Sequence, residues 1–198
     1  MNPDDSQLIA LSVRGDRTAF GELVRRYQDR LYHTAYRLIG NADDAQDVVQ
    51  DSFLNAYLSL HQFKGDARFF TWLYRIAVNA AISLKRKHRA LLTSDLGPRN
   101  SGPEPHDESD GSRPGTAMER AEDEKLLQDA LDALTPEHRA VLVLKEIEGR
   151  KYETIADVLG VPIGTVRSRL HRARLELRDR LQGAEEAGRE PPRDVGTV

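Results

Sequence analysis

Apolar residues recur at helical spacing through the first half of the chain. Between residues 20 and 39 they fall at positions i, i+3, i+4 and i+7, which predicts one long amphipathic helix. The same spacing predicts a second helix over about residues 42–62, and a third that Asp66 caps and that continues to about residue 89. A shorter helix is expected at residues 8–13. The N-terminal part should therefore be a bundle of three or four helices.

The second half of the chain carries four further stretches with this period. They predict short helices at residues 126–134, 136–149, 152–159 and 166–181. Thr135 and Pro136 form a typical helix start, in which a capping hydroxyl precedes a proline at the first helical position. Strands are not indicated, because apolar and polar residues do not alternate. The predicted fold class is all-α, with two small helical domains, and Gly160 between the last two helices makes their arrangement a helix-turn-helix.

Residues 93–117 separate the two helical parts and differ in composition. These 25 residues include four Gly and four Pro, and only Leu96 and Ala117 are apolar. Such a segment cannot bury enough apolar surface to offset its ordering entropy, which predicts a flexible acidic linker. The same argument predicts a disordered tail at residues 183–198, so that the domains span residues 1–92 and 118–182. We expect two individually stable units that are not rigidly coupled.

Composition narrows the class of protein. The chain has 198 residues, 39% of them hydrophobic and 31% charged, and it has no cysteine, which excludes disulfides and thiolate metal sites. No apolar run approaches the roughly 20 residues of a membrane span, and the acidic N-terminus is unlike an export signal, so a cytoplasmic location is expected. The net charge of −3 hides local differences, because residues 163–180 hold six arginines against two acidic residues.

The last predicted helix has an apolar and a polar side. At 100° per residue the apolar side holds Val166, Leu170, Ala173 and Leu177, and the opposite side holds Arg167, Ser168, His171 and Arg172. If the helix entered a major groove, the polar side would meet base edges, while Arg169 and Arg174 on the flanks would reach phosphates. A basic, solvated face on a structural helix is the alternative interpretation.

The predicted helix over residues 42–62 carries an acidic stripe. Its members lie within about 100° of arc opposite the apolar face, with no basic residue among them: Asp43, Asp44, Asp47 and Asp51. A solvated helix start accounts for Asp43 and Asp44, because acids in the first turn interact favourably with the helix dipole. It does not account for Asp47 and Asp51, because like charges four residues apart repel. The stripe therefore favours a basic protein partner.

Aromatic and basic residues are interleaved at the start of the third helix. This combination suits a surface that stacks unpaired bases and neutralises their phosphates. The basic members are Lys64, Arg68 and Arg75, the aromatic ones include Phe70 and Trp72, and Asn79 lies on the same flank of the apolar stripe as Trp72. Core packing is the alternative, and it is the simplest role for Phe69 and Phe70 because both lie on the apolar stripe. The basic end at residues 85–89 also has a structural explanation, as favourable charge at a helix C-terminus.

Motifs of known enzyme classes are absent from the sequence. The chain has no HExxH, GxSxG or phosphate-binding GxxxxGK[ST] pattern, and its six histidines are scattered. We therefore expect no catalytic activity, no cofactor and no metal site.

Three stretches together resemble the extracytoplasmic-function group of sigma factors, the smallest members of the sigma-70 family of bacterial RNA polymerase. They are DDAQDVVQDSFLNAY at residues 43–57, TWLYRIAVNAA at 71–81 and VPIGTVRSRLHRAR at 161–174. The resemblance covers residues 8–181. It implies a subunit that performs no chemistry itself, directs core polymerase to specific promoters and assists promoter melting.

The resemblance also implies roles for the candidate residues. The helix at residues 43–57, including Gln50 among its aspartates, would bind core polymerase. Residues 63–75 and Asn79 would melt and read the minus-ten promoter element, and the polar side of the last helix would read the minus-thirty-five element. The expected partners are core RNA polymerase, promoter DNA and an anti-sigma factor, either free or held at a membrane, with no small-molecule substrate.

Two other classes of protein share part of this pattern. A transcription regulator of the LuxR-like type also ends in a helix-turn-helix, but it needs an N-terminal sensory domain. The N-terminal bundle supplies neither a strand pattern nor a pocket for one. A nucleic-acid enzyme would need catalytic residues that the sequence lacks.

Overall fold

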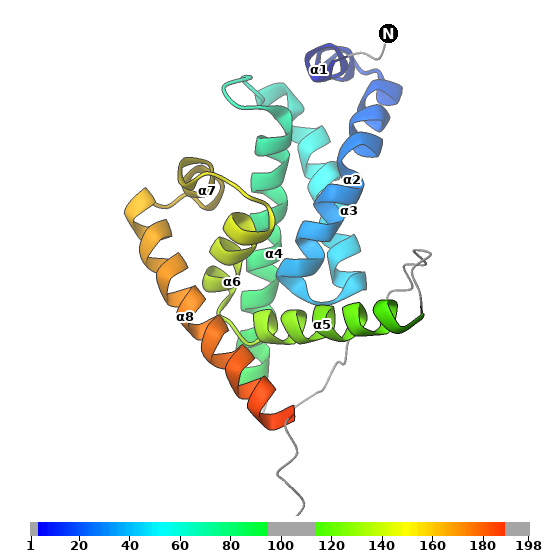
Figure 1. Ribbon diagram of the computed structural model, residues 1–198. Coiled ribbons are helices and arrows are strands. Elements are labelled where there is room, and N and C mark those ends of the chain that lie inside the picture. Colours follow the sequence, from blue (N-terminus) through cyan, green and yellow to red (C-terminus); the bar gives the residue numbers. More distant parts are fainter. Residues whose placement is uncertain (1–3, 95–113, 189–198) are drawn as a thin grey trace, which may run out of the picture.

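The computed structural model describes residues 4–94 and 114–188, which form helices joined by short loops (Figure 1). The N-terminal unit contains α1 (Asp5–Val13), α2 (Arg17–Ile39), α3 (Ala42–Ser59), the 3₁₀ turn η1 (Leu60–Gln62) and α4 (Phe69–Ser94). The C-terminal unit contains α5 (Pro114–Asp132), α6 (Pro136–Leu142), the π-helical turn η2 (Val143–Ile147), α7 (Tyr152–Leu159) and α8 (Ile163–Gly188). No strand occurs in these two parts, so the all-α prediction is confirmed. None of their helices is long and apolar enough to span a membrane.

Helix ends follow local sequence signals. Asp16, Asn41 and Thr135 occupy N-cap positions, where their side chains accept hydrogen bonds from backbone N–H groups of the first turn. Gly40 and Gly160 follow α2 and α7 with φ angles of 76° and 63°, a left-handed conformation that glycine adopts at little steric cost. The predicted helix start at Thr135 and the predicted turn at Gly160 are therefore confirmed.

The N-terminal unit is built on α2, α3 and α4, which pack against one another through their apolar stripes. Leu23 and Leu31 of α2, Ala45 of α3, and Leu73 and Val78 of α4 are fully buried at the centre of this bundle. Burial of these side chains is the main source of stability for the unit, since removing a large apolar side chain from water contributes about 1.5–3 kcal/mol.

α1 is attached to α2 through Asp5. Its carboxylate accepts a hydrogen bond from the phenol of Tyr27 and pairs with Arg26 at 2.7 Å. Burial, followed by the hydrogen bond and the charge of Asp5, raises the pKa of Tyr27 to about 12. The protonated phenol of Tyr27 thus adds a hydrogen bond to the apolar contact that the buried Leu8 of α1 makes with the core.

The start of α4 differs from the prediction. The helix begins at Phe69, and the backbone N–H groups of Thr71 and Trp72 donate to the Arg68 carbonyl, so Asp66 is not its cap. Gly65 has a φ of 78° in the bend before the helix, and this bend leaves Asp66 outside the N-cap position.

The ends of the linker and of the tail also differ. α4 ends at Ser94 and α5 begins at Pro114, both inside the segment predicted as linker, and proline suits a first turn because its missing N–H is not needed there. α8 continues to Gly188, past the predicted boundary at residue 182, because alanine and glutamate, two good helix formers, dominate the extension. The rest of the predicted linker and tail, residues 95–113 and 189–198, lies outside the described residues.

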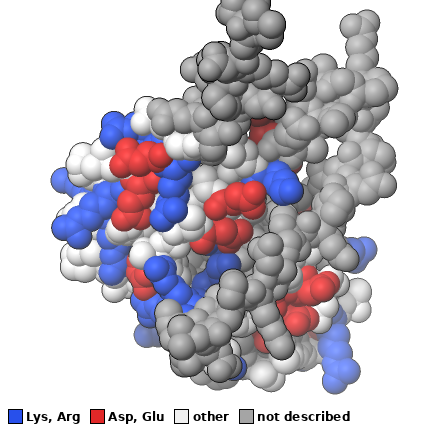
Figure 2. Space-filling view, turned by 90° about the horizontal axis from the view of Figure 1, so that it is seen from below, with Lys and Arg blue, Asp and Glu red and all other residues white. Residues whose placement is uncertain are grey.

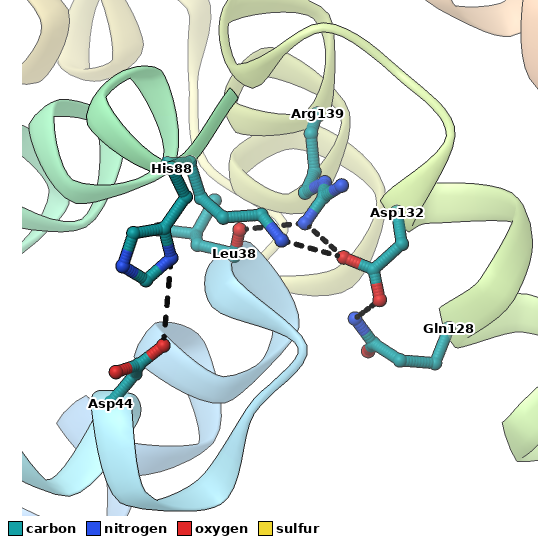
Figure 3. A network of polar contacts seen from close by, with 7 residues as sticks. Leu38, Asp44, His88, Gln128, Asp132 and Arg139 are labelled. Carbon is teal, nitrogen blue, oxygen red and sulfur yellow. Dashed lines mark hydrogen bonds and ion pairs between the residues drawn. The ribbon is translucent and has the colours of Figure 1, made fainter. Parts of the chain in front are cut away.

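The two units pack directly against each other, an arrangement that the prediction of a flexible linker did not anticipate. α6 and α7 lie beside α4, and α5 crosses near the end of α2 (Figure 1). Arg139 of α6 is 1% exposed, and its Nη1 donates to the Leu38 carbonyl of α2 at 2.8 Å and to Asp132 at 2.5 Å. Lys85 of α4 pairs with the same carboxylate at 3.1 Å (Figure 3). A network of buried and half-buried charges thus joins the units.

The loop after η2 makes a second contact between the units. Glu148 accepts a hydrogen bond from Thr34 at 2.8 Å and pairs with Arg30 at 3.2 Å, both on α2. The guanidinium of Arg150 lies 5.0 Å from the ring centroid of Tyr74 on α4. Charged side chains make much of this junction, and hydrophobic periodicity does not reveal such contacts because it reports only apolar faces.

Candidate nucleic-acid interface

α7, the turn at Gly160 and α8 form the helix-turn-helix, and α8 has the two sides that its periodicity predicts. Val166, Leu170 and Ala173 are buried, and Leu177 is half-buried. The opposite side exposes Arg167, Ser168, His171 and Arg172. These side chains provide guanidinium, imidazole and hydroxyl groups, which are the groups that hydrogen-bond to base edges in a major groove.

The two arginines that flank this face have different surroundings. Arg169 is half-buried and makes no salt bridge within the described ranges. Arg174 is exposed and donates through Nε and Nη2 to Glu146 Oε1 at 3.0 and 2.6 Å. The hydrogen bond to Glu146 is the main cause that raises the pKa of Arg174. The phosphate contact predicted for Arg174 therefore competes with an acid of its own domain.

The start of α4 presents basic residues around a half-buried tryptophan. The basic candidates are exposed: Lys64, Arg68 and Arg75. Trp72 packs against Phe63 with 5.2 Å between ring centroids, and part of its surface remains accessible. Asn79 donates from its side-chain amide to the Val158 carbonyl of α7 at 3.4 Å. Five of the six candidates thus retain some exposure, but the helix-turn-helix lies against this region.

Phe70 is not available for base stacking, which corrects its inclusion among the nucleic-acid contacts. The residue is 7% exposed. Its ring centroid lies 5.1 Å from that of Tyr27 and 5.2 Å from that of Tyr74. The guanidinium groups of Arg30 and Arg150 lie 4.7 and 5.1 Å from the same centroid. Phe70 is a packing residue, as its place on the apolar stripe indicates.

A cleft of about 550 Å³ lies between the start of α4 and the turn that joins α7 to α8. Trp72 and Arg75 of α4 line one side, and Gly160, Val161 and Pro162 of the helix-turn-helix turn line the other. Two of the α4 candidates, Trp72 and Arg75, therefore lie across this cleft from the turn of the helix-turn-helix, whereas the polar side chains of α8 do not line it.

The acidic stripe of α3 is largely exposed. Accessible side chains are Asp43, Asp47, Gln50 and Asp51. Asp44 is partly covered and lies 3.8 Å from His88 of α4 (Figure 3). Leu54 and Leu58 continue the stripe and are 57% and 62% exposed. Sequence reasoning missed these leucines, although each lies seven residues after an aspartate of the stripe and hence on the same side of the helix.

Basic and acidic side chains are interleaved on the surface shown in Figure 2 rather than separated into regions of one sign. The salt bridges Arg86–Glu137 and Arg178–Asp179 also bring opposite charges together at the surface of the described residues. On this face, therefore, no broad positive field is presented to a phosphate backbone.

The candidate surfaces offer hydrogen bonding, charge and stacking. In the parts of the chain that the structure describes, no three His, Asp or Glu side chains are grouped so that they could hold a metal ion. The chemistry that these surfaces support is recognition of another macromolecule.

Comparison with known proteins gives independent evidence. Two family models match the chain, Sigma-70 region 2 over residues 23–91 and Sigma-70, region 4 over residues 124–177. The RNA polymerase sigma-H factor of Pseudomonas aeruginosa is 40% identical over 181 residues, which cover 90% of this chain and 94% of that protein. The ECF RNA polymerase sigma factor SigW of Bacillus subtilis is 34% identical over 172 residues, which cover 85% of this chain and 92% of SigW.

Solved structures match at the level of the whole chain. The sigma factor RpoE from Bartonella quintana, solved in complex with the anti-sigma factor NepR, has a TM-score of 0.66 and 27% identity over 82% of this chain and 96% of RpoE. CnrH, solved in complex with the cytosolic domain of CnrY, has a TM-score of 0.61 and 29% identity over 93% of this chain and 99% of CnrH.

Proposed function

The chain belongs to the sigma-70 family, as an RNA polymerase sigma factor of the extracytoplasmic-function group. We propose which of its surfaces contact the promoter and which contacts the polymerase. Like its relatives it directs RNA polymerase in transcription initiation, and it is a non-enzymatic subunit. The resemblance drawn from three sequence stretches is thereby confirmed. The LuxR-like alternative fails, because sigma-70 region 2 occupies the N-terminal part where that class needs a sensory domain.

The exposed side of α8 is the proposed reader of the minus-thirty-five element. The observation that carries this proposal is the exposure of Arg167, Ser168, His171 and Arg172 on the second helix of a helix-turn-helix. Arginine makes bidentate hydrogen bonds to guanine, and each good pair contributes about 1–3 kcal/mol of discrimination. Arg169, on the flank, is the proposed phosphate contact.

The start of α4 is the proposed minus-ten surface. Trp72 can stack an unpaired base with its accessible part, and Arg75 and Asn79 can hydrogen-bond to base edges or to the backbone. Lys64 and Arg68 lie in the segment that precedes α4, and they would neutralise phosphates of the melted strand. Phe70 holds the helix from inside and takes no direct part.

The exposed side of α3 is the proposed docking surface for core polymerase. It combines the carboxylates of Asp47 and Asp51 with the exposed side chains of Leu54 and Leu58. Exposed leucines at helical spacing contribute apolar burial to a protein interface, and the flanking acids select a basic partner. Neither feature stabilises the isolated bundle.

Promoter binding would require the two units to separate. The two elements are about 25 base pairs apart, which is about 85 Å along a B-form duplex at roughly 3.4 Å per base pair. In the packed arrangement Trp72 of the minus-ten surface lines a cleft whose other side is the turn at Gly160 and Val161, so the helix-turn-helix lies beside the surface that would take a melted base. Polymerase is the proposed scaffold that holds the units apart.

An anti-sigma factor is a further proposed partner. RpoE of B. quintana was solved in complex with the anti-sigma factor NepR, and CnrH was solved in complex with the cytosolic domain of CnrY. A cytoplasmic location is proposed with it, since the polymerase and the promoter DNA that the chain serves are found there.

Reconstitution with core polymerase tests the proposal. The purified chain is added to core enzyme and genomic DNA, and the 5′ ends of the transcripts are sequenced. Start sites should share two sequence elements, at about minus ten and minus thirty-five, that are absent with core enzyme alone. Start sites identical to those of core enzyme would contradict the proposed division of surfaces.

A further inference from the structure

The ion pair between Arg174 and Glu146 links the recognition helix to the turn η2. Glu146 Oε1 accepts from both Nε and Nη2 of Arg174, which is the edge of the guanidinium that would bind two phosphate oxygens. Both side chains are exposed, at 52% and 42% of their surface, so the pair lies at the rim where a DNA backbone would pass.

The opposite flank of α8 lacks such a pair. Arg169 forms no salt bridge with any residue that the structure describes. The charge of Arg169 acts on Glu137 and lowers the pKa of that carboxyl, but it does so without a salt bridge, whereas Arg174 is held by Glu146 at hydrogen-bond distance. This asymmetry does not follow from the sequence pattern, in which the two arginines have equivalent positions on either side of the polar face.

We propose that Glu146 tunes DNA binding by withholding Arg174 from the phosphate backbone. The inference rests on the proposed function, in which α8 lies in a major groove. An exposed ion pair contributes only about 0–1 kcal/mol, so a phosphate could compete for Arg174 on strength alone. The displaced Glu146 carboxylate would then remain beside that phosphate, and their repulsion cancels the gain.

The consequence is weaker binding to DNA of any sequence. Each phosphate that a side chain neutralises adds about 0.9 to the slope of log affinity against log salt, and it does so without reading sequence. By removing one such contact, Glu146 lowers capture of the chain by non-promoter DNA, while the base contacts of Arg172 are untouched. Glu146 is in this sense a specificity-determining residue that need not touch DNA.

The test measures binding of the full chain to a labelled duplex without promoter elements, by fluorescence anisotropy at several salt concentrations. Glu146→Gln should steepen the salt slope by about 0.9, so that affinity falls about 3.5-fold more than for wild type between about 50 and 200 mM salt. Glu153→Gln is the matched control, because Glu153 is exposed in the same unit and forms no salt bridge among the described residues. It removes the same charge and should leave the slope unchanged.

Two alanine variants locate the effect. In the wild-type background Arg169→Ala should reduce the slope by about 0.9, and Arg174→Ala should leave it nearly unchanged. In the Glu146→Gln background Arg174→Ala should abolish the gain. Two results would overturn the inference. One is a salt slope that stays steeper in the Glu146→Gln, Arg174→Ala double variant, and the other is a slope for Glu146→Gln equal to that for Glu153→Gln.

Failure of the proposed function has a different signature. If α8 does not contact DNA, Arg169→Ala and Arg172→Ala will also have no effect on any duplex or on start-site selection. If α8 contacts DNA but Glu146 plays no part, Arg169→Ala will still lower the slope, and only the Glu146→Gln result will fail.

Discussion

Replacement of Asp132 by asparagine is expected to loosen the packing between the two units. Asp132 Oδ1 accepts from Arg139 at 2.5 Å and from Lys85 at 3.1 Å, and Oδ2 accepts from Gln128 at 3.4 Å (Figure 3). Asparagine has the same size but no charge, so Arg139 and Lys85 would face each other without a counter-charge. These two cations belong to different units, and their repulsion would act directly against docking. Burial, and next to it the charge of Arg139, already lowers the pKa of Lys85.

The size of the effect follows from the burial of Arg139. Without the Asp132 carboxylate its 1% exposed guanidinium keeps the Leu38 carbonyl as an acceptor but loses its counter-charge. Breaking a buried pair from one side costs about 3–5 kcal/mol. Because the Asp132 side chain is 32% exposed, water compensates part of this loss, and we expect about 2–3 kcal/mol. Lys85→Met removes only the ion pair between units and should cost about 1 kcal/mol or less.

The cysteine-free sequence makes the assay direct, because two cysteines can be introduced for a pair of dyes without competing thiols. Asn55→Cys on α3 and Arg180→Cys on α8 are at exposed positions in different units. Energy transfer between the dyes should be lost at lower urea concentration in Asp132→Asn than in wild type, with Lys85→Met in between. Equal midpoints for Asp132→Asn and wild type would refute the reasoning. Lys85→Met is informative even if Asp132→Asn also weakens α5, because Lys85 lies in the other unit.

Three further predictions concern other surfaces. Exchange of Asp47 and Asp51 for lysine should leave the unfolding free energy within about 0.5 kcal/mol of wild type, because both are exposed, and should abolish co-purification with core polymerase; retained binding would contradict the docking surface. Arg172→Ala should cost about 1–3 kcal/mol at one position of the minus-thirty-five element, and a selection from a promoter library that returns the wild-type preference would argue against a base contact. Between about pH 10 and pH 12 the wild-type protein should lose more stability than Tyr27→Phe. The pKa of Tyr27 in the folded state, about 12, lies above its ordinary value of 10.0, so the unfolded state releases the proton first. Urea unfolding in which both proteins show the same dependence of stability on pH would count against the Tyr27–Asp5 bond.

The helices themselves, and those helix ends that a strong cap or a glycine marks, were predictable because their signals are local. A cap at Thr135 and a left-handed glycine at Gly160 act on backbone groups within one turn, so the residues that decide the structure are adjacent in the sequence. The two sides of α8 were predictable for the same reason, since the periodicity of an isolated helix already separates Val166 from Arg172.

Individual site residues were harder to predict where a side chain can serve either packing or contact. Phe70 and Trp72 are both aromatic residues near basic ones, yet Phe70 is enclosed by Tyr27, Tyr74 and two arginines while Trp72 keeps an accessible edge. In the sequence pattern Leu54 is indistinguishable from an apolar core position, but no element of the described chain covers it. The outcome in each case depends on which elements pack nearby.

The sequence by itself determined the helices, the helix-turn-helix and the family, because these rest on neighbours within a turn or on stretches of contiguous residues. Only the tertiary structure decided that the two units pack together and which charges hold them. Arg139 would be expected on the surface from its residue type, but it is buried against the Leu38 carbonyl, 101 residues away in the chain. Its Nη1 is satisfied there by the Leu38 carbonyl of the other unit together with the Asp132 carboxylate of its own, and an acceptor supplied by a distant segment is a property of the folded chain that no local pattern contains.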